Sequence, residues 1–127
     1  MKIKQSTFYA LQAIWVIDKE DNMIVTSKII AEKANLSQGV LVRVLRILVK
    51  ADILKVYQGR GEISGGFSLN KSIDEITLLE IVETMEGVDI CANLSTDESK
   101  LLDKVGQIND QLRIELSRYT VRELLES

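Results

Sequence analysis

Residues 26–51 read TSKIIAEKANLSQGVLVRVLRILVKA and predict two short helices joined by a turn. Thr26 and Ser27 are good N-cap residues for the first helix, and Ser37 is one for the second. The turn between them, from Ala34 to Ser37, has the length found in helix-turn-helix motifs. The second helix is apolar apart from one basic side. We therefore expect it to be largely buried, with that side left for solvent or a ligand.

The basic side of the helix predicted over residues 37–51 is formed by Arg43, Arg46 and Lys50, which share a face at spacings of three and four. The small polar residues Ser37–Gly39 begin this helix, where a recognition helix meets the edges of bases. Arginine pairs with guanine, glutamine pairs with adenine, and long cations neutralise phosphates. The pattern favours DNA contact. A core helix with a solvated basic edge is the alternative.

A glycine-rich hairpin is predicted directly after this helix. Ile53–Gln58 favours a strand, Phe67–Leu69 resumes one, and four glycines lie between them. A helix-turn-helix followed by such a hairpin is a winged helix. Arg60 at its tip could enter a minor groove, although a plain surface hairpin is the alternative. A phosphate-cradling nucleotide loop is disfavoured, because neither Gly-x-Gly-x-x-Gly nor a Gly-Lys-Ser/Thr sequence occurs.

The rest of the chain is predicted to be helical. A helix is expected over residues 4–19, and capping boxes at Thr77–Glu80, Ser95–Glu98 and Thr120–Glu123 predict three more. The helix opened by the second box is the longest, ending at about Ser117 or two residues later. An apolar stripe that suits dimerisation runs along it: Leu101, Val105, Ile108, Leu112, Leu116 and Tyr119. The expected fold is mainly α with a small β-hairpin wing, divided into a DNA-binding region 1–70 and a helical dimerisation and sensing region 71–127.

The composition disfavours an enzyme. The 127 residues suffice for about one domain, and 46% hydrophobic with 28% charged residues is typical of a soluble globular protein. The chain has no histidine, which excludes catalytic triads, Cys-His dyads and His-containing metal sites. Its single cysteine, Cys91, cannot form an internal disulfide or a four-thiolate zinc site. We therefore expect neither catalysis nor a bound metal.

The charge is unevenly distributed. Residues 1–60 carry ten Lys or Arg against five Asp or Glu, whereas residues 61–127 carry six against fourteen. This asymmetry indicates a basic face for a polyanion, with a random surface distribution as the alternative. No apolar run approaches the ~18 residues that a membrane span needs. We expect a cytoplasmic protein that does not enter a membrane.

Four segments resemble one known family. They are YALQAI (9–14), IIAEKANLSQGVLVRVLRILVKADIL (29–54), RGEISGGFSL (60–69) and EITLLEIVETMEG (75–87). Together they are similar to the Rrf-two family of bacterial winged-helix transcription regulators, which includes the iron–sulfur cluster regulator and the nitric-oxide-sensitive repressor. The resemblance extends over nearly the whole chain.

The resemblance implies a homodimer whose long C-terminal helices cross, and which binds a semi-palindromic operator in double-stranded DNA as a repressor. Matching positions imply a minor-groove contact by Arg60 and phosphate contacts by Ser27 and Lys28. Positions that contact bases in the family are matched by Ser37, Gln38, Gly39, Val40 and Arg43.

Three positions depart from the family pattern. The wing has three residues, Glu62–Ser64, where the family usually has two. Asp52 stands where the recognition helix commonly ends in glycine, which adopts the left-handed conformation more easily. Val42 stands where a subset of members has a base-contacting glutamate, so the operator of that subset is not expected here.

The cofactor is the largest departure. Iron–sulfur members have three clustered cysteines after the MEG segment, and only Cys91 is present here. Asp97 and Asp103 are poor cluster ligands and no histidine is available, so we expect no iron–sulfur cluster. Cys91 could be a buried structural residue, a redox sensor or a metal ligand.

A second function stays open. The apolar residues Val42, Ile47 and Val49 resemble positions that are often polar in the family. They favour a winged-helix module that binds another protein and no longer reads DNA sequence. The steep salt dependence of DNA binding separates the two functions.

Overall fold

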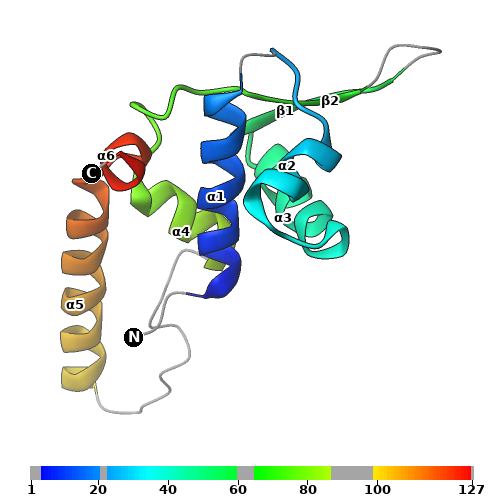
Figure 1. Ribbon diagram of the computed structural model, residues 1–127. Coiled ribbons are helices and arrows are strands. Elements are labelled where there is room, and N and C mark those ends of the chain that lie inside the picture. Colours follow the sequence, from blue (N-terminus) through cyan, green and yellow to red (C-terminus); the bar gives the residue numbers. More distant parts are fainter. Residues whose placement is uncertain (1–3, 21–22, 60–64, 87–98, 127) are drawn as a thin grey trace.

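The protein folds as a helical body with a two-stranded hairpin (Figure 1). The structure, a computed structural model, describes residues 4–20, 23–59, 65–86 and 99–126. In chain order the elements are α1 (Gln5–Lys19), α2 (Ser27–Ala34), α3 (Gln38–Lys50), β1 (Leu54–Tyr57), β2 (Gly66–Leu69), α4 (Leu78–Glu86), α5 (Ser99–Ser117) and α6 (Val121–Leu125).

Side-chain caps set the start of both helices in the predicted helix-turn-helix. Thr26 Oγ1 accepts a hydrogen bond of 3.3 Å from the backbone N–H of Ile29, and Ser37 Oγ accepts one of 3.4 Å from Val40. The turn between them is tight because Asn35 adopts a left-handed conformation with φ of 56°. The helix-turn-helix that residues 26–51 predict is therefore formed.

The recognition helix α3 ends in a left-handed residue, Asp52, with φ of 62°. The backbone N–H of Ile53 donates to the carbonyl oxygen of Leu48, and that of Asp52 donates to Val49, both at 3.0 Å. These two bonds form a Schellman motif, which satisfies carbonyl groups at the helix end. An aspartate therefore adopts the conformation that glycine adopts most easily.

The hairpin is extended by a single bridging residue, Val25. β1 and β2 are antiparallel with Leu54 opposite Leu69, and Val25 exchanges two backbone hydrogen bonds of 2.8 Å with Phe67 of β2. This close approach needs glycine at position 66, because a Cβ there would lie 2.6 Å from Ile24 Cγ2. The hairpin tip, residues 60–64, lies outside the described residues, and with it the three-residue departure from the family pattern.

One apolar core joins the two halves of the chain. α1 packs against α2, α3 and α4, and Figure 1 shows it between the helix-turn-helix and α4. The buried cluster contains Ile14 of α1, Leu45 of α3, and Ile73, Ile76 and Ile81 from beyond the hairpin. The division into regions 1–70 and 71–127 stays a prediction, and the core crosses its boundary.

Two of the predicted capping boxes begin helices, each through its threonine hydroxyl. Thr77 Oγ1 accepts a hydrogen bond of 3.1 Å from the N–H of Glu80, whereas the Glu80 carboxylate bonds to Lys71 at 2.5 Å instead of turning back. Thr120 Oγ1 accepts from the N–H of Glu123 at 3.2 Å and begins α6. The third box, at residues 95–98, lies outside the described residues.

The C-terminal end of α5 is fastened to the body of the protein. The N–H of Leu78 donates to the carbonyl oxygen of Tyr119 at 2.8 Å, and the N–H of Val121 donates to that of Ile76 at 2.7 Å. From this point α5 runs beside α4 and away from the hairpin (Figure 1). The long helix is thus an arm attached at one end.

Within the described residues, no helix is long and apolar enough to cross a membrane.

Candidate nucleic-acid interface

The outer side of α3 is the basic face that its sequence predicts. Its inner side is buried through Leu41, Val44, Leu45 and Leu48. Its exposed residues are Gln38, Gly39, Val42, Arg43, Arg46, Ile47 and Lys50. Packing of the apolar side thus turns all three predicted basic residues outward.

The cations on this side of the protein have no acidic partner. Within the described part of the chain, Lys28, Arg43, Arg46 and Lys50 form no ion pair. Four cations of the C-terminal half are paired with acids: Lys71 with Glu80, Arg113 with Glu83, Arg118 with Glu115, and Arg122 with Asp74 and Glu126. Since α3 also contains no Asp or Glu, its surface is locally positive in a protein of net charge −3.

The start of α2 adds a second positive feature. Ser27 and Lys28 are its first two residues, where backbone N–H groups and the helix dipole favour a phosphate. Ser27 is half-buried and Lys28 is exposed. Both are therefore placed where a helix N-terminus meets solvent.

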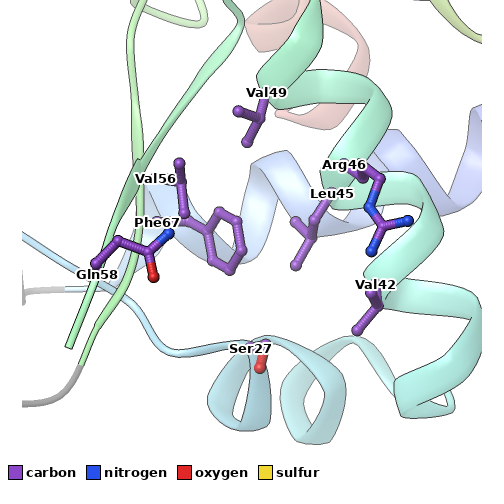
Figure 2. Close-up of a pocket in the computed structure, with 8 residues that line it drawn as sticks. All are labelled: Ser27, Val42, Leu45, Arg46, Val49, Val56, Gln58 and Phe67. Atoms are coloured by element: carbon purple, nitrogen blue, oxygen red, sulfur yellow. The ribbon is translucent and has the colours of Figure 1, made fainter.

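A pocket of about 350 Å³ lies between α3, the start of α2 and the hairpin (Figure 2). Leu45 of α3 and Phe67 of β2 point toward one another across it, and Ser27 closes one side. The remaining lining residues are Val42, Arg46, Val49, Val56 and Gln58. The recognition helix and the wing are thus separated by a hollow that has an apolar floor and polar groups at its edge.

Val56 of β1 and Gln58, directly after that strand, also line this pocket, and neither is among the residues that the sequence predicts for the site. The alternation of a strand provides the signal, because residues two apart face the same side. Leu54 of the same strand is buried, and Val56 and Gln58 continue its side outward.

The other side of α3 borders a second pocket of about 290 Å³. Val40, Arg43 and Ile47 line it together with Tyr9 of α1 and Met85 of α4. The predicted base-contacting residues therefore lie on two sides of α3, with Val40 half-buried toward α1 and α4.

Several predicted residues lie where the structure gives no description. Arg60 and Cys91 lie outside the described residues, so their roles stay predictions. Leu101 and Val105 belong to α5, but their side chains are also outside the description. Of the remaining stripe, Leu116 is buried and Leu112 half-buried within one chain, while Ile108 and Tyr119 are exposed.

Comparison with known proteins identifies the family. Residues 3–127 match the family Rrf2, described as "Iron-dependent Transcriptional regulator". BadM of Rhodopseudomonas palustris, named as an HTH-type transcriptional regulator, is 31% identical over 116 residues, which cover 88% of this chain and 72% of BadM.

Solved structures show the same fold. CymR, the global cysteine regulator of B. subtilis, superposes with a TM-score of 0.75 at 26% identity, covering 99% of this chain and 97% of CymR. IscR of T. potens gives a TM-score of 0.73 at 24% identity, covering 99% and 87%. These similarities confirm the predicted winged-helix fold.

The word iron in the family description raises the question of whether this chain could hold a cluster. Protein iron–sulfur clusters are bound by cysteine thiolates and in some cases by histidine. The chain has one cysteine and no histidine, and among the described residues no group of three or more potential ligands is placed to hold a metal. The donor set does not fit a cluster bound by one chain.

The family match covers almost the whole chain, and the described fold places a helix-turn-helix and a hairpin where the sequence predicts them. The members of the family are transcriptional regulators, so the expectation that the protein is not an enzyme is confirmed. The chain belongs to the Rrf2 family of helix-turn-helix transcriptional regulators, the same Rrf-two family that its motifs resemble.

Proposed function

We propose that the protein is a cytoplasmic, homodimeric repressor that binds a semi-palindromic operator in double-stranded DNA. It does so without an iron–sulfur cluster. The observation that carries this proposal is the exposed face of α3, where Arg43, Arg46 and Lys50 have no acidic partner among the described residues. Cations that the protein does not neutralise itself are available to phosphates and base edges.

The shape of this side suits a winged helix on duplex DNA. With α3 in the major groove and the Arg60 wing toward the adjacent minor groove, the strand between the two grooves crosses the pocket beside α3. Arg46 and Ser27 stand at that pocket and would contact phosphates, while Val56 and Phe67 on the hairpin side of the pocket would contact the sugars. Gln38, Gly39 and Arg43 would then face base edges.

The dimer is supported by apolar surface that the described residues leave uncovered. A pocket of about 430 Å³ between α1, α4 and α6 is lined by Phe8, Leu11, Leu78, Leu124 and Leu125, and Phe8 is 52% exposed. α5 extends from this side and carries exposed Ile108, and exposed Tyr119 lies just beyond its end. We propose that α5 of a second copy covers this surface, which places two recognition helices one or two helical turns of DNA apart.

The proposal is tested by fluorescence anisotropy on the reduced protein at near-physiological salt. A duplex from directly upstream of its own gene is compared with an unrelated duplex of equal length. We expect much tighter binding to the upstream duplex, and affinity that falls by about 0.9 log units per phosphate contact for each tenfold rise in salt.

Equal weak binding to both duplexes would mean that the operator does not lie directly upstream of the protein's own gene. A selection from random duplexes then decides whether any sequence is preferred. Failure of that selection, with little dependence on salt, would favour the protein-interaction module that exposed Val42 and Ile47 also suit. Repression is tested separately, because a reporter driven by the selected operator should be expressed less when the protein is present.

A further inference from the structure

Val42 is an exposed apolar residue on the face of α3 that is otherwise polar and basic. Its side chain is 42% exposed, although the buried side of the helix offers apolar positions one residue away at Leu41. Gln38 and Arg46 stand one helical turn before and after it, and all three are exposed. The exposed part of this valine is therefore available to an apolar group of a ligand that lies against this row.

The major groove of DNA offers one apolar feature at the edge of its bases, the 5-methyl group of thymine. We propose that Val42 is a specificity-determining residue that contacts a thymine methyl group in each half-site. This inference rests on the proposed function. It gives Val42 a role in recognising DNA sequence, whereas the same apolar residue would otherwise favour the protein-interaction module.

The position of Val42 in α3 supports this assignment. It lies in the second turn of the helix, near the end at which recognition helices meet base edges. Exposed Ile47 lies further along α3, one turn beyond Arg43 and farther from the end at which recognition helices meet base edges. Of these two apolar residues on α3, Val42 is the better placed for a base.

The rigidity of valine adds to the argument. A β-branched side chain has one strongly preferred rotamer in a helix, so its methyl groups are held in place before DNA arrives. One flank of Val42 also lines the pocket beside Leu45 and Arg46. DNA binding therefore costs little conformational entropy at this side chain.

The experiment measures the affinity of the reduced wild-type dimer for the tightest duplex selected from a random pool. Each thymine is replaced in turn by deoxyuridine, which removes only the methyl group. At one symmetric pair of positions we expect affinity to fall by about fourfold per half-site, or about 15-fold when both are replaced. In Val42→Ala the thymine duplex should bind more weakly, and the same replacement should have little further effect.

Ile47→Ala provides the matched control, since it shortens an exposed apolar residue on the same helix and should keep the full deoxyuridine effect. The inference is overturned if no deoxyuridine weakens wild-type binding, or if Val42→Ala retains the whole penalty. Tight binding of the selected duplex in these cases leaves the proposed function standing. Failure of the wild-type protein to prefer any duplex overturns both.

Discussion

The side-chain amide of Asn70 donates a hydrogen bond of 2.9 Å to the backbone carbonyl oxygen of Asp52. The backbone N–H of Asn70 also donates to the carbonyl oxygen of Ile53 at 2.9 Å. The residue after β2 thus holds the turn that ends the recognition helix. Because of these two bonds, the hairpin and α3 keep a fixed relation to one another.

Asp52→Gly should stabilise the fold. Asp52 has φ of 62°, which is unfavourable for residues with a Cβ, and its charge stands at the negative end of α3. Part of the gain is offset because glycine is more flexible in the unfolded chain. We expect the free energy of unfolding to rise by about 0.5 to 1 kcal/mol in urea titrations. Asp52→Ala removes the charge but keeps the Cβ; equal stability of the two variants would contradict this account.

Gly66→Ala should destabilise the hairpin. A Cβ at this position would lie 2.6 Å from Ile24 Cγ2 and 2.7 Å from the carbonyl oxygen of Val25. Crowding of this kind lowers the free energy of unfolding by roughly 1 to 3 kcal/mol. Gly39→Ala is the control, because nothing lies within 4 Å of a Cβ there and alanine favours a helix. Urea titration should find Gly66→Ala less stable than wild type and Gly39→Ala at least as stable.

Arg43→Ala and Lys28→Ala should affect DNA binding in different ways. Arg43 is exposed on α3 and is proposed to face base edges, so its loss should reduce discrimination at particular base pairs by ~1 to 3 kcal/mol. Lys28 stands at the start of α2, so its loss should weaken all sequences alike and reduce the salt slope by about 0.9. Anisotropy titrations on cognate and random duplexes at several salt concentrations measure both effects. An equal loss on both duplexes for both variants would refute this division.

Ile108→Glu should weaken the proposed dimer without unfolding the chain. Ile108 belongs to the apolar stripe of α5 and is 50% exposed in one chain. Replacing it with a charge should raise the dissociation constant of the dimer by at least about tenfold. Ile114→Glu is the matched control, because Ile114 is 56% exposed on the same helix but lies off the stripe. Sedimentation equilibrium compares the two, and a larger effect of Ile114→Glu would move the interface to another face.

Glu126 should contribute to the pH dependence of stability. Hydrogen bonds from Lys19, at 2.6 Å, and then from Arg122 lower its pKa below the usual glutamate value. Its contribution is therefore complete above pH ~4.3 and is lost as pH falls through the lower pKa of the folded state. In urea titrations, Glu126→Gln should be less stable than wild type at pH 6, and the difference should shrink toward pH 3.

Asp110→Asn serves as the control for this variant, because Asp110 is exposed and has no ion pair among the described residues. It removes the same charge, so it reports the effect of net charge alone. A gap between wild type and Glu126→Gln that is constant from pH 6 to pH 3 would refute the role of the carboxylate.

Local signals explain why the helix-turn-helix could be predicted. Thr26 and Ser37 act on N–H groups three residues ahead, so the information lies within one turn of the chain. Asn35, between the two helices, tolerates the left-handed conformation because a short polar side chain can form local hydrogen bonds. These features depend on sequence neighbours alone.

Contacts between distant residues explain what could not be predicted. Glu80 completes a capping box in sequence, but the Lys71 ammonium attracts its carboxylate away from the helix start. Val25 pairs with Phe67 only after the chain has folded, so this bridge has no local pattern. The pocket lined by Val56 and Ser27 likewise requires the hairpin to pack beside α3.

The separation of paired from unpaired cations also affects how the protein associates with a DNA duplex. The protein as a whole is anionic, so a duplex approaching at random is repelled by most of the surface. Once the two come within about 8 Å, the screening length at physiological salt, the bare cations of α3 dominate the local field. A torque then turns this side toward the DNA. The protein is thus oriented on the DNA before it contacts any base, which raises the fraction of collisions that lead to binding.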